Sequence, residues 1–539
     1  MALPTWAEVA DVGRQLGSGQ WRIISLLSRL PLLWAKPLQA LAGLSGPASV
    51  YRSLEHLEKV GAVQPLEVPW QAGRTPRLWH LSDLGVAVAA SRTGQEPAEL
   101  AARNKLRRND FMREVAGLPQ LVALYEMLAT VAGWAPGAPE MLDWERPWRR
   151  AVPDAFGRRH AVRFPAAVQL GWGDRELSCL LLPDDVSVPL RAHRAGLQAL
   201  VRLRQLSGQE PPPLLIGTSD ARRARAWGRL LDEVQVEARG TIQADIIWSG
   251  CAPPLDRLVP RQLPSPSRVA PGELRPAQPQ EPVSAGVAGT GSPSRLARLG
   301  ARALDLAPAD LVAMDRLARQ AFLSVRQLAA FTELSVAETD PRLAQLIERG
   351  WVLQLPMEQN NTGEVLFEAT LDGLRLAAAR LGLSLQAAIR FCHFAGGGHE
   401  HPVGSRQGLL DTLDHTYGVN QVLANFVATA DVTSQLAGDG LGHWQPEAAA
   451  SNWELHPDAY GVYVLGEGRY GFFLEFDRGT MNTRDYRTKV DSYYRYRDSG
   501  QFTEVYDSFP HVLFVTASDA AEKRFGRVAQ AASAGRPPL

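Results

Sequence analysis

The sequence predicts an α+β chain built from two similar halves, and three observations support this. Two helices followed by a β-hairpin are expected within Trp21–Ser91, and the same pattern returns after residue 312. In each half a second hairpin leads into a helix and then a strand, within Phe164–Asp220 and Tyr460–Asp519. Between the halves, Ala252–Pro293 is rich in Pro, Ser, Gly and Gln, which is typical of a linker.

The length and composition of the chain limit the class of protein to which it can belong. A chain of 539 residues is too long for one hydrophobic core. Lys and Arg total 57, and so do Asp and Glu, so the overall charge does not indicate a nucleic-acid partner. Cys179, Cys251 and Cys392 have no regular spacing, which argues against a disulfide framework. With no expected signal peptide and no apolar stretch of ~20 residues, we expect a cytoplasmic protein without a membrane partner.

The first helical pair and its hairpin have the layout of a winged helix-turn-helix. The helix Ser45–Gly61 carries apolar residues at helical spacing and ends at a glycine. The wing consists of Val63–Val68 and Leu78–Leu81. We expect this unit to bind double-stranded DNA. The candidate DNA-binding residues are Ser49, Tyr51, Arg52 and His56 on the helix, and Arg74 and Arg77 on the wing.

The second copy of this pattern has a different charge. Phe322–Ala329 and Pro341–Gly350 supply its helices, and Met357–Glu368 supplies its wing. Glu338 and Asp340 lie where a DNA reader needs neutral or positive groups facing phosphate. We therefore expect the first copy to bind DNA and the second to serve packing or the formation of a homodimer.

The hairpin near residue 466 gathers acidic side chains. Strands are expected at Tyr460–Leu465 and Arg469–Phe476, and a two-residue loop at Gly466-Glu467 places Asp458 opposite Glu475. Directly opposed side chains lie ~5 Å apart on one face of a sheet. Asp477, two residues past Glu475, projects from the same face. We expect the three carboxylates to converge, and an oxygen-only cluster of this kind suits Mg²⁺ or Mn²⁺.

Lys489 is expected to complete this site. It falls one or two turns into a helix, Asp485–Arg497, that follows the second strand. From there its ammonium can reach the carboxylates and orient water or a scissile phosphate, as metal-assisted hydrolysis requires. The other interpretation of the same residues is that Asp458 caps a turn while Glu475 and Asp477 lie on a solvated strand end.

The order Pro457-Asp458, Glu475-x-Asp477, Lys489 resembles the PD-(D/E)xK nuclease pattern. The wider stretch resembles the bacterial replication-relaxation family, which occurs on plasmids and other mobile elements. The landmarks are His415–Asn420, the HPDAY segment, FFLEFDRGT, KVDSYYRY and FPHVLFVT, and they cover roughly Leu410–Val528. One departure is that Asp477 stands where the nuclease pattern has its lysine, so Lys489 would be a relocated substitute.

The resemblance implies a catalytic group of Asp458, Glu475, Asp477 and Lys489, with the three acids holding Mg²⁺ or Mn²⁺. It also gives the predicted domains their identities. These are a winged helix at 1–92, a degenerate nuclease-like domain at 93–250, a Pro-rich linker at 251–298, a second winged helix at 299–385 and a nuclease-like domain at 386–539. Each α/β domain would then have a restriction-endonuclease-like fold.

Further residues near the acidic hairpin are candidates for DNA contact. His415 opens a helix, Thr416–Ala430, expected beside the carboxylate sheet, where it can cap the helix or contact phosphate. Asn420 lies on the same helix, and Arg478 flanks the acids. In the first half, Arg107 and Arg108 occupy the position that corresponds to Gly418 and Val419.

The first half has no acidic pair. Pro165-Ala166 occupies the place of Pro457-Asp458, and we expect Pro183 where the second half has Glu475. Charge also separates the halves. Residues 101–230 hold 20 Lys and Arg against 13 Asp and Glu, whereas residues 411–530 hold 10 against 17. This contrast indicates that the first half holds DNA and the second cuts it, unless the charges are solvated surface groups of unrelated domains.

Two other site chemistries were considered. Cys392, His393, His399 and His401 cluster in a Gly-rich loop, but their spacing matches no standard zinc site, so a polar loop is favoured. Tyr493, Tyr494 and Tyr496 offer a nucleophile for covalent attack on phosphate, although aromatic residues at helical spacing more often form a core.

The sequence therefore favours a DNA-binding, metal-dependent phosphodiesterase that nicks or cleaves DNA, in plasmid or mobile-element replication or mobilisation. The alternative is a non-catalytic replication-initiation or regulatory protein that uses a nuclease-like scaffold. A third interpretation, a protein-interaction adaptor, would hold if the basic first half did not bind DNA.

Overall fold

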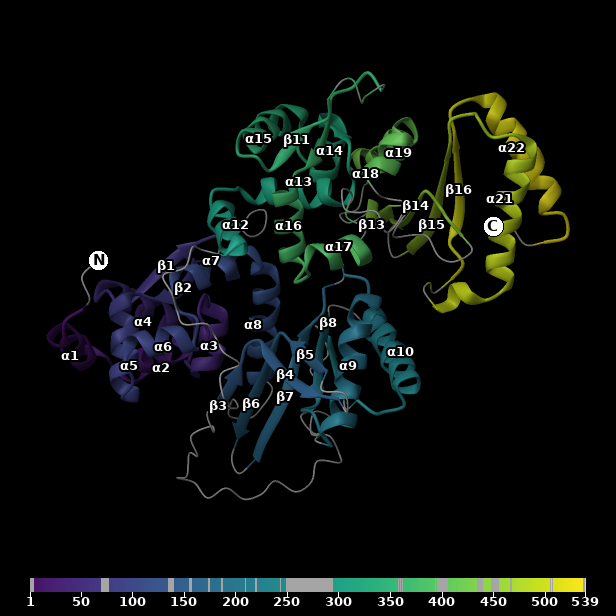
Figure 1. Ribbon diagram of the computed structural model, residues 1–539. Helices are drawn as coiled ribbons and strands as arrows, with labels where there is room; N and C mark the ends of the chain where they lie inside the picture. Colours follow the sequence, from purple (N-terminus) through teal and green to yellow (C-terminus); the bar gives the residue numbers. More distant parts are fainter. Residues whose placement is uncertain are drawn as a thin grey trace. The chain divides into compact units, whose positions relative to one another are not determined.

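The computed structural model describes residues 4–539 with these gaps: 69–76, 134–139, 155–157, 173–174, 186–187, 209, 219–220, 243, 249–293, 357, 359, 361, 393, 395–405, 434–439, 447–454, 466–467, 505, 507 and 537–538. The chain is a mixed α+β protein with several small sheets (Figure 1). It divides into two units, Met1–Leu306 with 380–382, and Ala307–Ala379 with Leu383–Leu539. Arg74, His393, His399, His401 and most of the expected linker lie outside the described residues.

The first unit begins with helices, continues with a two-stranded hairpin, and ends in a larger sheet. Its elements are α1 Trp6–Gln15, α2 Ser18–Leu27, α3 Ala35–Ala42, α4 Pro47–Lys59, β1 Val63–Glu67, β2 Arg77–Leu81, α5 Asp83–Thr93, α6 Pro97–Arg103, α7 Arg108–Ala116, α8 Leu118–Ala132, β3 Glu140–Glu145, β4 Trp148–Pro153, β5 Arg159–Phe164, β6 Ala166–Trp172, β7 Arg175–Pro183, α9 Arg191–Ser207, β8 Leu214–Thr218, α10 Ala221–Ala238, β9 Ala244–Trp248 and α12 Arg295–Ala303.

The second unit repeats the order of helices, small sheet and larger sheet. Its elements are α13 Pro308–Arg319, β10 Leu323–Ser324, α14 Val325–Thr332, α15 Val336–Glu348, β11 Val352–Gln354, β12 Leu366–Ala369, α16 Leu371–Arg380, α17 Leu385–Cys392, α18 Arg406–Asp411, α19 Leu413–Thr433, β13 Gly440–Pro446, β14 Ala459–Leu465, β15 Gly468–Asp477, α21 Thr483–Asp498, the 3₁₀ turn η2 Gln501–Glu504, β16 His511–Thr516 and α22 Asp519–Ala532.

The helix pair and hairpin expected near the N-terminus are present. Helix α4 begins with Pro47 at a position where a missing N–H costs nothing, and it buries one side, at Val50, Leu54 and Leu57. Strands β1 and β2 pair antiparallel from Val63–Leu81 to Glu67–Arg77. The equivalent elements in the second unit are α14, α15 and the sheet β10-β12-β11, which has one strand more.

The larger sheets of the two units share a topology. In the first, the order is β3-β6-β7-β8-β9, with β6 and β7 antiparallel, β7 and β8 parallel, and α9 as the crossover. In the second, the order is β13-β14-β15-β16, with β14 and β15 antiparallel, β15 and β16 parallel, and α21 as the crossover. Both outer pairs, β3–β6 and β13–β14, contain a register irregularity. The expected internal similarity is therefore visible in strand order and direction.

The register of the first sheet shows which residues lie at the end of its hairpin. In the first sheet Ala166 pairs with Leu181, and both side chains are fully buried. At the end of β7, Pro183 pairs with Gly217 of β8, whereas in the second sheet Glu475 pairs with Phe514 and Asp477 with Thr516 of β16. The expected correspondence of Pro183 with Glu475 stays a prediction. The paired side chains at this end of the first hairpin are apolar.

The sheets are held by separate apolar clusters. In the first unit, α9 and α10 cover the sheet through Leu197, Leu200 and Trp227. In the second, aromatic rings fill the space between α21 and β14–β15, around Phe473 and Tyr493. The three tyrosines considered as nucleophiles, Tyr493, Tyr494 and Tyr496, are all buried, as expected of a core.

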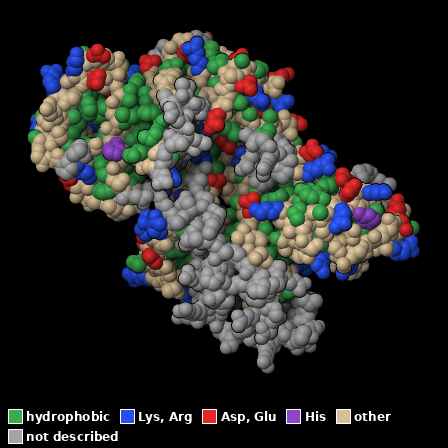
Figure 2. Space-filling view, turned by 180° about the vertical axis from the view of Figure 1, so that it is seen from behind, with side chains coloured by type: hydrophobic (Ala, Val, Ile, Leu, Met, Phe, Trp, Pro, Cys, Tyr) green, Lys and Arg blue, Asp and Glu red, His purple; other side chains and the backbone are tan. Residues whose placement is uncertain are grey.

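Among the described residues, no single helix is both long and apolar enough to cross a membrane. One pair of segments, Pro97–Ala116 and Leu118–Ala132, reaches the length and composition together but bends by 99° between them. On the face seen in Figure 2, the described basic and acidic side chains are interspersed, which agrees with equal totals of the two signs.

Candidate functional site

The acidic hairpin has the register expected from its sequence. Ala459 pairs with Leu474, and the pairing continues to Leu465–Gly468. One residue before β14, the Asp458 N–H donates to the Leu474 carbonyl at 2.9 Å. Asp458 therefore lies at the end of this register, next to Leu474 and Glu475. Both acidic side chains are buried, and the charge of Asp458 contributes to raising the pKa of Glu475.

Glu475 is the centre of the site. It is 1% exposed, and its two oxygens have different partners. Oε2 forms an ion pair with the Lys489 ammonium, and Oε1 accepts a hydrogen bond from the Tyr493 hydroxyl. Burial raises the pKa of Glu475 to about 7, although the Lys489 charge opposes this, because a buried carboxylate loses its hydration. Burial and the adjacent Glu475 likewise raise the pKa of Tyr493.

The helix that carries Lys489 is positioned by its own first turn. Asn482 Oδ1 accepts from the N–H groups of Arg484 and Asp485, at 2.8 and 3.1 Å, and Asp485 Oδ2 accepts from the Asn482 N–H at 3.2 Å. This capping box fixes where α21 begins. Lys489 then falls in the second turn, as the sequence predicted.

Asp458 connects the hairpin to a helix from earlier in the chain. Its Oδ2 accepts from the Phe476 N–H at 2.6 Å, and its Oδ1 lies 3.2 Å from His415 Nε2. His415 is in the first turn of α19, and its ring lies 5.8 Å from the Phe476 ring. The structure therefore brings together Asp458, Glu475, Lys489 and His415 as the cluster that we call the acid–lysine site.

Asp477 has a different position from the one expected. Its Oδ1 accepts from the N–H groups of Gly479, Thr480 and Met481 at 3.0–3.3 Å, and its Oδ2 accepts from the Tyr486 hydroxyl. The backbone donors draw this carboxylate to the β15–α21 connection. Across the part of the chain that the structure describes, no three His, Cys, Asp or Glu residues form a group able to hold a metal ion. The expected convergence of three carboxylates is thus wrong.

Asp458 and Glu475 remain as oxygen donors, and they are near enough for the charge of Asp458 to raise the pKa of Glu475. Mg²⁺ is commonly bound by one or two carboxylates and completes its octahedron with water and substrate phosphate. The pair therefore fits such an ion by donor type and number. Glu475 would have to share the oxygen that now faces Lys489.

The predicted DNA-binding residues have varied surroundings. On α4, Tyr51 is 59% exposed, Arg52 is exposed with Nε donating to the Ala48 carbonyl, and Ser49 is half-buried. On β2, Arg77 is exposed and lies 3.5 Å from Glu67. The remaining assignments are Arg107 and Arg108 exposed at the start of α7, Arg478 within 3.4 Å of Asp414, and Asn420 buried with Nδ2 donating to the Ala321 carbonyl. The observed role of Asn420 is to connect α19 to the start of the small sheet.

Two features of the site were missed in the sequence. Tyr486 and Tyr493, seven residues apart on one face of α21, each donate to a carboxylate on β15. Gly418 allows α19 to approach the hairpin, because a Cβ there would lie 2.1 Å from Cε1 of Phe476. The seven-residue tyrosine spacing was visible in the sequence. The close approach at Gly418 had no local signal.

The structure and site define an α+β protein whose second unit contains a buried carboxylate–lysine pair beside a histidine. Residues 314–512 match the model of the family described as Replication-relaxation. Neither the curated proteins nor the solved structures gave a match to the chain.

The matched range agrees with the sequence-based resemblance to that family and extends it. It contains Asp458, Glu475 and Lys489, and it begins about a hundred residues before His415, so that it includes α14 and α15. The resemblance to PD-(D/E)xK nucleases stays a prediction.

Proposed function

We propose that this chain is a DNA-binding protein that acts in plasmid or mobile-element replication or relaxation, and that its acid–lysine site nicks or cleaves DNA with a divalent cation. The family match over residues 314–512 supports the biological setting. The observation that carries the catalytic part is the buried Glu475, which forms an ion pair with Lys489 and lies near the charge of Asp458. Burying such charges costs stability, and groups with shifted pKa values concentrate at functional sites.

We assign DNA binding to a winged helix formed by α3, α4 and the β1–β2 hairpin. Tyr51 and Arg52 project from the exposed side of α4, opposite the buried Val50 and Leu54. Arg77 pairs with Glu67 only at the surface, where both side chains are more than half exposed. A pair of this kind contributes little, so Arg77 is available to phosphate.

At the acid–lysine site, Asp458 and Glu475 would hold the ion. A bound Mg²⁺ or Mn²⁺ would supply Lewis-acid stabilisation of a phosphodiester and a more acidic water. Lys489, 28% exposed at its side chain, would contribute positive charge beside the phosphate and orient the attacking water. His415 lies where it can hold Asp458 in place or contact a non-bridging phosphate oxygen. Asp477 would set the β15–α21 connection and so the direction from which Lys489 approaches.

A second candidate function is a non-catalytic DNA-binding protein with the same sheet. It is favoured by one observation. Each oxygen of Asp458, Glu475 and Asp477 already has a hydrogen-bond or ion-pair partner. A network that is satisfied in this way holds α19, β15 and α21 together without any ion.

Cleavage of supercoiled plasmid separates the two candidates. With Mg²⁺ or Mn²⁺, the wild-type chain is expected to convert supercoiled plasmid to open-circular or linear DNA, and Glu475→Ala is expected to lose this conversion. If both proteins convert the plasmid equally, the acid–lysine site does not catalyse cleavage. If the wild-type chain binds the plasmid but does not convert it, the chain has no cleaving activity. Either result would favour the non-catalytic function. A gel shift without metal, comparing Arg52→Ala with wild type, tests the DNA binding itself.

A further inference from the structure

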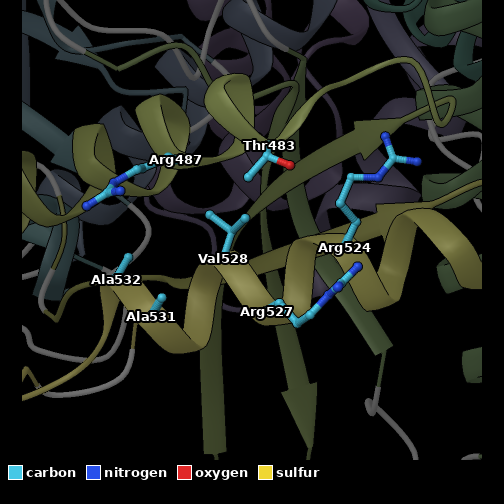
Figure 3. Close-up of a pocket in the computed structure, with 7 residues that line it drawn as sticks. All are labelled: Thr483, Arg487, Arg524, Arg527, Val528, Ala531 and Ala532. Atoms are coloured by element: carbon cyan, nitrogen blue, oxygen red, sulfur yellow. The ribbon is translucent and has the colours of Figure 1, made fainter.

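A groove between the last two long helices is lined by arginines. It encloses about 310 Å³ and lies between Thr483 and Arg487 of α21 and the segment Arg524–Ala532 of α22. Figure 3 shows Thr483 and Val528 near its middle, with Arg487 toward one end and Arg524 and Arg527 toward the other. The remaining lining residues are Ala531 and Ala532, which are small.

The groove follows from how the helices are connected. Helix α21 links the parallel strands β15 and β16, and α22 follows β16, so the two helices run in the same direction side by side. Thr483 and Arg487 lie four residues apart on one face of α21, and Arg524, Arg527 and Val528 share the facing side of α22. Lys489 lies two residues beyond Arg487, about 200° around the helix, and contacts Glu475 instead.

The guanidinium groups of the groove belong to Arg487, Arg524 and Arg527. None of them has an acidic partner among the described residues. Arg524 Nη1 donates to the Met481 carbonyl at 2.9 Å, and Arg527 Nε donates to the Lys523 carbonyl at 3.3 Å. Each guanidinium has five N–H donors, so these bonds use only a small part of its capacity. By contrast, Arg497 and Arg478 in the same unit are ion-paired with Asp498 and Asp414.

We propose that this groove binds backbone phosphates of a DNA duplex. The inference rests on the proposed DNA binding and adds a second contact surface, in the unit that also contains the acid–lysine site. Planar guanidinium groups match phosphate in a two-pronged geometry, and small alanines leave room for a chain of phosphates rather than a single enclosed ion. Three arginines spread along a groove suit a ligand with repeated negative charge.

The test uses the full chain with a random-sequence 30-base-pair duplex, without metal, over a range of salt concentrations. The double variant Arg487→Gln/Arg527→Gln is expected to bind about 10-fold or more weakly near 0.1 M salt, and to lower the slope of log affinity against log salt by about 2. Arg495→Gln is the matched control, because Arg495 is exposed on the same helix, donates to Ser492 Oγ and is not one of the residues that line the groove. Thermal melting of each variant checks that the fold is kept.

The outcomes separate this inference from the proposed function. If the wild-type chain does not bind the duplex at low salt, both fail. If it binds and the double variant binds with the same affinity and slope, the groove assignment fails while DNA binding stands. Inorganic phosphate supplies the third arm. If millimolar phosphate at constant ionic strength raises the melting temperature of wild type but not of the double variant, and the duplex does no more, the groove is a small-anion site and the assignment to DNA is overturned.

Discussion

Glu475 illustrates what the site costs the protein. Its carboxyl group is almost completely buried, and its pKa is raised to about 7, so the folded chain binds a proton there more tightly than the unfolded chain does. Lys489 and Tyr493 reduce the free-energy cost of burying the ionised carboxylate, but they do not remove it. A buried ion pair adds little net stability, but its loss leaves an uncompensated charge.

The first prediction concerns pH. Because the folded pKa of Glu475 is above its unfolded value of 4.5, its contribution favours folding most below pH 4.5 and decreases as the pH rises toward 7. Glu475→Gln removes this dependence. The unfolding free energy of wild type relative to Glu475→Gln is therefore expected to fall by about 3 kcal/mol between pH 4.5 and 7.5. Calorimetry of both proteins across this range measures it, and a difference independent of pH would contradict the raised pKa.

The second prediction concerns Lys489. In Lys489→Met, Glu475 loses its ionic partner, and its pKa should rise further. We expect a loss of about 3 kcal/mol at pH 8 and a much smaller loss at pH 5, where Glu475 is protonated. The double variant Lys489→Met/Glu475→Gln should recover most of the loss at pH 8. Urea denaturation of the four proteins at both pH values measures the coupling.

Some contacts of single residues can be predicted from the sequence and others cannot, depending on the kind of contact. The pairing of β14 with β15 could be predicted, because a two-residue loop fixes every pair in a hairpin, and this pairing brings Asp458 near Glu475. The position of Asp477 could not. Strand alternation puts it on the Glu475 side, but three backbone N–H groups of the following turn compete for the same carboxylate. That competition depends on the three-dimensional course of the turn.

At the scale of elements, α19 and the hairpin approach each other through Gly418. The absence of a side chain there lets the Phe476 ring fill the space, and this brings His415 within reach of Asp458. Adding a single carbon atom at Gly418 should therefore lower the stability of the fold.

The third prediction is that Gly418→Ala destabilises the second unit by about 2 kcal/mol, because Phe476 or the helix must move. Gly526→Ala on α22 is the control. A Cβ at Gly526 meets nothing within 4 Å, so this change should stabilise by about 0.5–1 kcal/mol through helix propensity. Thermal unfolding of the two variants distinguishes them, and equal effects would mean that the close approach is not maintained in solution.

The predicted elements agree best with the structure where local periodicity is strong. Helices α4 and α21 and the hairpin β14–β15 were expected within a few residues of their observed bounds. Strands β3, β4, β5 and β9 were not expected, since the tendency of a short segment to form a strand depends strongly on the residues it packs against. Helix α12 was not expected either, and the predicted boundary between the linker and the second winged helix, at residues 298 and 299, falls inside it. It packs against α7 in the first unit, where a Cβ at Gly300 would lie 1.6 Å from the Met112 carbonyl oxygen.

At the scale of the whole molecule, the proposed DNA contacts lie in both units. Arg52 is in the first and the arginine groove is in the second. If the two surfaces hold the same duplex through independent contacts, their free energies of binding should add.

The fourth prediction follows from this additivity. Arg52→Ala is expected to weaken duplex binding by about 5- to 10-fold, and the combination with Arg487→Gln/Arg527→Gln should weaken it by the product of the separate losses, to within about 2-fold. Fluorescence anisotropy of the labelled duplex with each protein measures these values. A combined loss no larger than either separate loss would show that only one unit holds the DNA at a time.

The shared topology of the two larger sheets has one more consequence. The first sheet keeps the same strand directions and crossover, and its hairpin pairs the buried, apolar Ala166 and Leu181 at the start of β6. The same arrangement of strands thus forms in this chain with an apolar pair in one sheet and with the acid–lysine site in the other. The buried charges are therefore not needed to form this arrangement of strands.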